Sequence, residues 1–125
     1  MNGSGDRKPL RLIVIDDDRD VADSLAMLME GIGAEVRVAY DGCSGVEAAA
    51  EFQPDLALID IRMPRVDGYE TARRMRERLG ARAPRLIALS GLGQDKDRQR
   101  ARAAGFDRHL TKPVPLESLE SLATA

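Results

Sequence analysis

An apolar run that ends in a carboxylate, and is soon cut by a proline, constrains the fold of this chain most. The run lies within residues 56–64, and it contains Asp60 and Pro64. Because it is short and continuous, it predicts a strand that is buried on both faces of a parallel sheet. Asp60 would then stand at the carboxyl end of that strand, which is where open α/β sheets bind ligands.

Strand and helix patterns alternate along the rest of the chain. Apolar segments predict further strands at residues 10–15, 34–40, 85–89 and 107–110. A helix with Asp18 as its N-cap, ended by Gly31 and Gly33, follows the first strand. The other helices are predicted at about residues 45–52, 69–79, 95–104 and 116–122. Five alternations with short loops predict a single α/β domain, a parallel sheet with helices on both faces.

Length and charge limit the class of protein. The 125 residues suit one domain, at residues 10–125, after a polar, glycine-rich stretch at residues 1–9 that is predicted to be a disordered lead-in or an expression scar. A net charge of −2 gives no general reason to expect nucleic-acid or membrane binding. Cys43 is the single cysteine, and no apolar run reaches the roughly 20 residues of a membrane span. A cytoplasmic location is therefore expected.

Polar residues follow four of the predicted strands. They are Asp16 and Asp17, Asp60, Ser90 and Lys112. Because parallel strands end at the same edge of a sheet, these side chains should converge on one cleft. Carboxylates packed together repel one another, and a hard divalent cation relieves that repulsion. Oxygen ligands without nearby Cys or His favour Mg²⁺.

The same residues suggest phosphoryl transfer with Asp60 as the nucleophile. Ser90 could bond a phosphate oxygen, and Lys112 could pair with it as a point charge. Taken singly, each residue has an ordinary explanation, because aspartates cap helices, serines occupy turns and lysines are solvated. Their presence at successive strand ends is what favours a site.

These motifs together resemble the response-regulator receiver domain of two-component signalling, a CheY-like domain. The matching segments are LIVIDDD at 12–18, LIDIRMP at 58–64 followed by Asp67-Gly68, IALSG at 87–91, and GFDRHLTKP at 105–113. The last segment is closest in sequence to receivers of hybrid sensor histidine kinases. The resemblance extends over about residues 10–123 and implies a (βα)5 doubly wound domain with strands in the flavodoxin-like order 2-1-3-4-5.

The resemblance implies a role for each matching residue. Asp60 would be the phosphoacceptor and, with Asp17 and the backbone carbonyl of Arg62, a direct Mg²⁺ ligand. Asp16 would act on the metal through water. Ser90 and Lys112 would contact the phosphoryl group, and the peptide bond before Pro113 would be cis. The donor would be a phosphohistidine of a sensor histidine kinase or phosphotransfer domain. Such a domain is no enzyme beyond its own phosphorylation and dephosphorylation.

One position departs from the usual receiver pattern. Receivers often carry Tyr or Phe three residues before the lysine, whereas this chain carries His109. Histidine is polar and titrates near neutral pH, so the usual aromatic switch would here be an imidazole coupled to Ser90. The downstream protein partner is expected on the face made by the fourth helix, the fifth strand and the fifth helix. An ordinary strand residue is the alternative for His109.

Two other functions remain open at this stage. The chain could be a receiver-like binding module that is never phosphorylated. It could also be a phosphatase of the haloacid-dehalogenase type, because Asp16 and Asp18 form the Asp-x-Asp that such enzymes use. The second alternative leaves the segment from Asp60 to Pro64 unexplained, and the chain is short for that fold.

Overall fold

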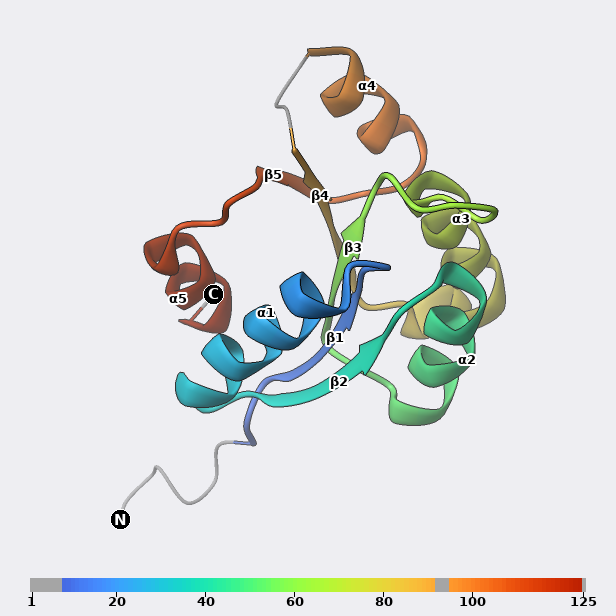
Figure 1. The fold of residues 1–125 in the computed structure, drawn as a ribbon. Helices are drawn as coiled ribbons and strands as arrows, with labels where there is room; N and C mark the ends of the chain where they lie inside the picture. Colours follow the sequence, from blue (N-terminus) through green and yellow to red (C-terminus); the bar gives the residue numbers. More distant parts are fainter. Residues whose placement is uncertain (1–7, 92–94, 125) are drawn as a thin grey trace.

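Five strands and five α-helices alternate in the computed structural model, which describes residues 8–91 and 95–124 (Figure 1). The strands are β1 (Arg11–Ile15), β2 (Glu35–Ala39), β3 (Leu56–Asp60), β4 (Arg85–Ser90) and β5 (Arg108–Thr111). The helices are α1 (Arg19–Gly31), α2 (Gly42–Phe52), α3 (Gly68–Leu79), α4 (Asp95–Ala103) and α5 (Leu116–Thr124), with a short 3-10 helix, η2 (Gly80–Arg82).

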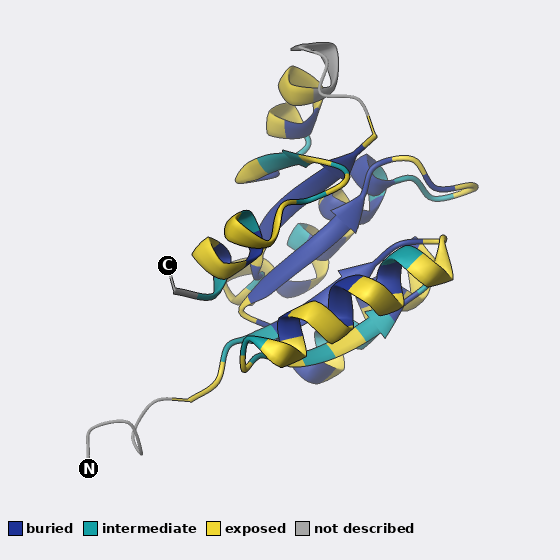
Figure 2. Ribbon diagram, turned by 60° about the vertical axis from the view of Figure 1, so that its left-hand side comes forward, coloured by how far each residue is buried: buried dark blue, intermediate teal, exposed yellow. Residues whose placement is uncertain are grey.

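All strand pairs are parallel, and their order across the sheet is β2-β1-β3-β4-β5. The predicted fold class and strand order are therefore confirmed. Every residue of the central strand β3 is buried, as the continuous apolar run predicted (Figure 2). The edge strand β2 instead alternates between exposed and less exposed residues.

Helices cover both faces of the sheet (Figure 1). Helices α1 and α5 lie on one face, where Met29 and Leu119 belong to a cluster with inward residues of β1, β3 and β4. Helices α2, α3 and α4 lie on the other face, where Met75 and Ala101 pack with the alternate residues of the same strands. The two clusters fix the sheet between two helical layers, so its carboxyl edge is held rigidly.

Aspartates begin three of the helices. The carboxylates of Asp18, Asp41 and Asp67 each accept a hydrogen bond from the backbone N–H of the third residue of the helix. The predicted cap at Asp18 is confirmed. At the other end of α1, Gly33 has a left-handed φ of 106°, a conformation that commonly ends a helix, as its position suggested.

Several predicted boundaries were wrong by a few residues. Helix α2 begins at Gly42 rather than residue 45, because the Asp41 carboxylate caps it there. Strand β2 ends before Tyr40, and β5 is shifted one residue toward the C-terminus. The 3-10 helix η2 was not predicted. Most of the predicted lead-in, residues 1–7, lies outside the described residues. Within the described ranges, no helix is both long and apolar enough to cross a membrane.

Candidate functional site

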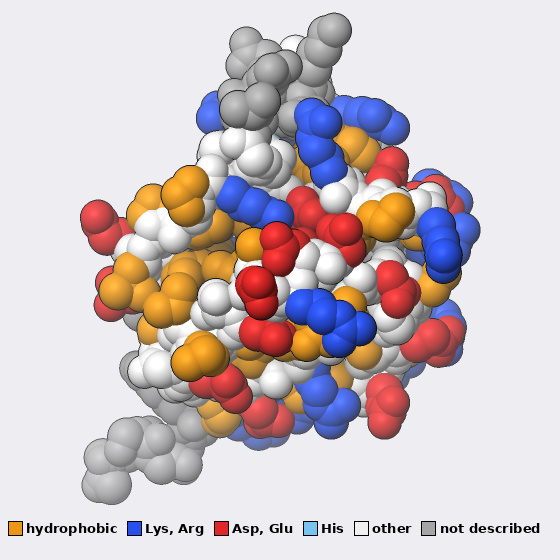
Figure 3. Space-filling model, viewed as in Figure 1, with side chains coloured by type: hydrophobic (Ala, Val, Ile, Leu, Met, Phe, Trp, Pro, Cys, Tyr) orange, Lys and Arg blue, Asp and Glu red, His pale blue; other side chains and the backbone are white. Residues whose placement is uncertain are grey.

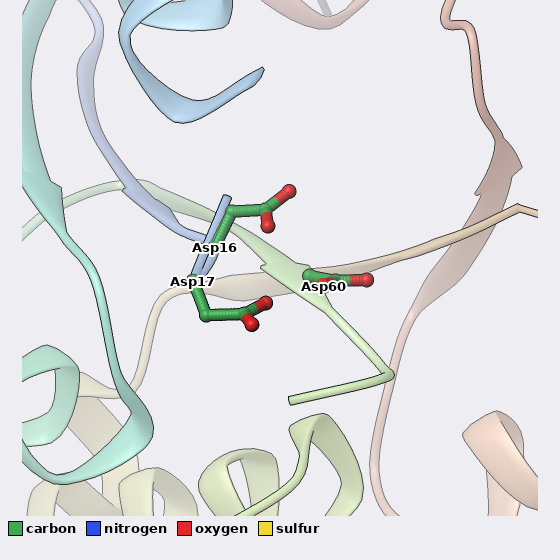
Figure 4. A group of neighbouring side chains, drawn as sticks. All are labelled: Asp16, Asp17 and Asp60. Atoms are coloured by element: carbon green, nitrogen blue, oxygen red, sulfur yellow. The ribbon is translucent and has the colours of Figure 1, made fainter. Parts of the chain in front are cut away.

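Three carboxylates meet at the carboxyl edge of the sheet, as Figure 4 shows. Asp16 and Asp17 follow β1, and Asp60 is the last residue of β3. One oxygen from each carboxylate lies within 4.8 Å of the others. Asp16 and Asp60 are buried, with 0% and 6% exposure, whereas Asp17 is exposed. The predicted convergence of the three carboxylates is confirmed, and Asp17 forms the open side of the group.

Lys112 completes the cluster from the segment after β5. Its ammonium nitrogen lies 2.8 Å from Oδ2 of Asp16 and 3.3 Å from Oδ1 of Asp60. The Lys112–Pro113 peptide bond is cis, as the resemblance implied. One ammonium therefore faces three carboxylates, and the cluster keeps an excess of negative charge (Figure 3, centre of the view).

Backbone groups hold two of the carboxylates in place. Oδ1 of Asp16 accepts a hydrogen bond of 2.9 Å from the N–H of Asp18. Oδ1 of Asp60 accepts one of 3.3 Å from the N–H of Arg62. Close packing adds to this, because a Cβ atom at Gly68 would lie 2.4 Å from the carbonyl oxygen of Asp60. The absence of a side chain at Gly68 lets the start of α3 approach the end of β3.

The charges of this cluster are coupled. Burial and, after it, the negative charge of Asp16 raise the pKa of Asp60 to about 6, although the charge and hydrogen bond of Lys112 lower it. Burial works against the charged form of Lys112, yet the hydrogen bond to Asp16 and the charge of Asp60 outweigh it, so the pKa of Lys112 is raised. Lys112 therefore stays cationic, whereas the excess negative charge of the cluster contributes to the raised pKa of Asp60.

The donor set fits a hard divalent cation. The three grouped ligand atoms are carboxylate oxygens, one carboxylate is open to solvent, and the negative charges outnumber the single ammonium. Mg²⁺ binds through one or two carboxylates and keeps several waters, which such a half-open group allows. For Arg62 the described backbone contact is its N–H on Asp60, so its carbonyl as a metal ligand stays a prediction.

Ser90 and His109 contact each other beside this cluster. Ser90 ends β4 and is fully buried, and its Oγ lies 2.7 Å from Nε2 of the half-buried His109. His109 is paired in register with Ala88, so its side chain lies on the same face of the sheet as Ser90. The sequence suggested that the two residues are coupled, but it did not reveal this direct hydrogen bond or the ion pair between Lys112 and Asp16.

Comparisons with known proteins agree with this geometry. The family model of the response regulator receiver domain matches residues 12–124. The chain is 34% identical over 109 residues to the DNA-binding dual master transcriptional regulator RpaA of Synechocystis, with 87% of this chain and 45% of RpaA aligned. It therefore spans about half the length of that regulator.

A second relative and a solved structure match over most of their length. Protein PilG of Pseudomonas aeruginosa is 32% identical over 110 residues, which make up 88% of this chain and 82% of PilG. The chemotaxis protein CheY4 of Vibrio cholerae superimposes with a TM-score of 0.87 over 94% of this chain and 98% of CheY4, at 21% identity, which supports the fold. The sequence motifs, the acidic edge of the sheet and the family match agree, and this chain belongs to the response-regulator receiver domains of two-component signalling.

Proposed function

We propose that this receiver domain accepts a phosphoryl group on Asp60 from a phosphohistidine of a sensor histidine kinase or phosphotransfer domain, in a cytoplasmic relay. The observation that carries the proposal is the group of three carboxylates within 4.8 Å, with Lys112 against two of them. A phosphoryl group beside such a cluster needs positive charge and a fixed nucleophile, and the described residues supply both.

Asp60 suits the role of nucleophile better than Asp16. Both oxygens of Asp16 already accept hydrogen bonds, one from the N–H of Asp18 and one from Lys112. Both described contacts of the Asp60 carboxylate fall on Oδ1, so within the described residues Oδ2 has no hydrogen-bond donor. An oxygen without a donor is the better attacking atom, and this contrast argues against a phosphatase that uses Asp16.

In the proposed reaction, a carboxylate oxygen of Asp60 attacks the phosphorus atom of the phosphohistidine. The O–P bond forms, the P–N bond breaks, and the imidazole nitrogen leaves with the electron pair. Lys112 would pair with the phosphoryl oxygens, and the buried hydroxyl of Ser90, at the end of β4, would contact them as well. Asp17, Asp60 and the Arg62 carbonyl would hold Mg²⁺ directly, and Asp16 through water. When bound, the ion supplies positive charge for the carboxylates and the transferring group.

The proposed output is a change on the face formed by α4, β5 and α5. Ser90 contacts His109 directly, so a movement of the serine hydroxyl toward a phosphoryl group would remove the bond that holds the imidazole. Phosphorylation would then shift the population between two arrangements of this face, and a downstream protein would bind one of them more tightly. Hydrolysis of the phosphoaspartate would return the domain to its first state.

Intact mass measurement after incubation with acetyl phosphate and Mg²⁺ tests the proposal. We expect one added phosphoryl group in the parent chain and none in Asp60→Asn. Asp18→Asn is the matched control, because it removes a neighbouring carboxylate and keeps a helix-capping residue. This control should gain the group like the parent.

The outcomes separate the alternatives. A parent chain that gains no phosphoryl group, although it is folded and binds Mg²⁺, would favour the receiver-like binding module. A label on Asp16, or turnover of phosphate esters, would favour the phosphatase. Label retained in Asp60→Asn would contradict the assignment of the acceptor.

A further inference from the structure

A small basic cavity lies between α4 and β5, on the face proposed for partner binding. Its volume is about 210 Å³, and its lining includes Arg98 and Arg102 of α4 and Arg108 and His109 of β5. All three arginines are exposed. Arg98 and Arg102 are one helical turn apart, so their side chains lie on the same side of α4.

The three arginines carry charge that is not neutralised within the described parts of the chain. Among the side chains that the structure describes, at residues 8–91 and 98–123, no acidic group forms an ion pair with Arg98, Arg102 or Arg108. Asp107 also lines the cavity, but its carboxylate is already bound. Its Oδ2 lies 3.0 Å from the guanidinium of Arg76 and accepts a hydrogen bond of 2.8 Å from the N–H of Leu86.

The other arginine-rich element, α3, is different in this respect. Arg73 and Arg74 both bind Glu70, and these hydrogen bonds lower the pKa of Glu70 to about 2. Arg78 pairs with Glu47 at 2.8 Å. The arginines of α3 are therefore paired with acidic side chains, in contrast to those of the cavity, and Figure 3 shows basic side chains around α4 at the top of the view.

We propose that the α4–β5 cavity receives a carboxylate side chain from an acidic segment of the downstream protein. This inference rests on the proposed function for the choice of face, and it adds the chemistry of the partner. Guanidinium groups bind carboxylates through paired hydrogen bonds, and three of them around one small cavity suit a single inserted Asp or Glu. A nucleic acid needs an extended basic strip, whereas the arginines of the neighbouring helix α3 pair with acidic side chains.

The cavity also connects to the proposed phosphorylation site. His109 lines the cavity, and its Nε2 lies 2.7 Å from Oγ of Ser90 at the end of β4. A carboxylate in the cavity therefore lies beside the residue that holds Ser90. Because coupling between two sites is reciprocal, a change at Ser90 alters the affinity of the cavity, and an occupied cavity alters the state of Ser90.

Fluorescence anisotropy with a labelled, capped oligoglutamate peptide tests the cavity, with oligoglutamine as the neutral peptide. We expect the full chain to bind the acidic peptide and the double variant Arg98→Gln/Arg102→Gln to bind it roughly tenfold more weakly. The matched control is Arg82→Gln/Arg85→Gln, which removes the same number of charges at two exposed arginines outside the cavity. This control should stay within about twofold of the parent.

The coupling has its own measurement. Adding beryllofluoride and Mg²⁺ should change the peptide affinity of the parent chain and leave that of His109→Ala unchanged. An equal change in both proteins would overturn the connection through His109. Phosphoryl uptake by the double arginine variant is measured separately by mass, and we expect it to match the parent.

Other results would overturn the acidic partner. Equal binding of the peptide by the double variant and its control would do so, as would displacement of the peptide by equimolar inorganic phosphate. A single-stranded oligonucleotide that binds more tightly than the peptide, and loses affinity in the double variant, would assign the cavity to a nucleic acid instead of an acidic protein segment. Self-association that the double variant loses, without peptide binding, would assign the face to a second copy. A parent chain that binds the peptide yet takes up no phosphoryl group would refute the proposed function and leave the cavity standing.

Discussion

At the scale of single residues, Asp60 is where burial and charge conflict most. It is 6% exposed beside the charge of Asp16, and its pKa rises from 3.8 to about 6. A carboxyl whose pKa is higher in the folded than in the unfolded state binds its proton more tightly when folded. Its contribution to stability is therefore full below about pH 4 and is lost as the pH rises through about 6. In the metal-free protein, ionised Asp60 destabilises the fold at neutral pH.

We expect Asp60→Asn to stabilise the metal-free protein. The shift of the pKa corresponds to about 3 kcal/mol at about pH 7.5, which is an upper bound for the gain in the free energy of unfolding. The gain should fall toward zero below about pH 3, where Asp60 is protonated in both states. Urea unfolding in the presence of EDTA at several pH values measures it.

Glu51→Gln is the matched control, because Glu51 is exposed on α2. Its difference from the parent should vary little over the same pH range. A destabilised Asp60→Asn at about pH 7.5 would mean that Lys112 stabilises the ionised carboxylate more than burial and Asp16 oppose it.

The sequence predicts the acidic residues of the site better than their contacts. Asp16, Asp17 and Asp60 follow buried strands, and parallel strands end at one edge, so their convergence needed no side-chain detail. The bond between Ser90 and His109 depends on the register of β4 against β5 and on two rotamers. No spacing along the chain encodes those quantities.

At the scale of elements, the junction between β3 and α3 depends on a glycine. The N–H of Gly68 donates a hydrogen bond of 2.8 Å to the carbonyl of Ile61. A Cβ atom at Gly68 would lie 2.4 Å from the Asp60 carbonyl oxygen and 2.6 Å from the Ile61 Cα, both of them backbone atoms that cannot rotate away. A side chain there would separate α3 from the end of β3.

We expect Gly68→Ala to lower the free energy of unfolding by about 1–3 kcal/mol, because the added methyl group overpacks the junction. It should also slow phosphoryl uptake, since the displaced backbone carries Asp60. Chemical denaturation and the rate of mass increase with acetyl phosphate measure the two effects.

Gly31→Ala is the contrasting variant. No atom lies within 4 Å of a Cβ atom at Gly31, the last residue of α1. The same substitution should therefore stabilise the protein by up to about 1 kcal/mol through helix propensity. Equal destabilisation by both variants would contradict the packing explanation.

Element boundaries were harder to predict where glycines serve packing. The helix predicted at residues 45–52 leaves Gly42 outside it, yet α2 begins at Gly42, so both Gly42 and Gly45 lie inside the helix. A Cβ atom at Gly42 would lie 2.2 Å from Oγ1 of Thr71, and one at Gly45 would lie 2.5 Å from Cδ1 of Ile15. These glycines allow α2 to approach α3 and β1, and such contacts between distant segments cannot be read from local patterns.

At the scale of the whole molecule, the site lies where the strand order changes direction. β1 and β3 are neighbours, and the chain leaves β1 toward β2 on one side and β3 toward β4 on the other. The two loops diverge, and the acidic residues occupy the crevice between them. The strand order was predictable from the alternation and the family motifs, since few right-handed topologies fit five short crossovers.

Mg²⁺ should therefore stabilise the whole fold. A ligand that binds the native state alone raises the melting temperature as its concentration increases, and we expect about 3–10 °C at millimolar Mg²⁺. Asp17→Asn should lose most of this rise, while Glu117→Gln, at an exposed position on α5, should keep it. Differential scanning calorimetry at matched ionic strength measures the shifts. Identical responses of the two variants would argue against a metal site at the acidic cluster.

The two outer strands have a consequence for how this molecule behaves in a crowded solution. No strand of the described residues pairs with the outer edge of β2 or of β5, so a strand of another chain could add to either edge. Charged, exposed side chains stand on both of them, Glu35 and Arg37 on β2 and Arg108 on β5. The charge of Arg108 thus opposes the addition of another strand to the outer edge of β5. A partner bound beside Arg108 would cover the same edge for as long as it stays bound.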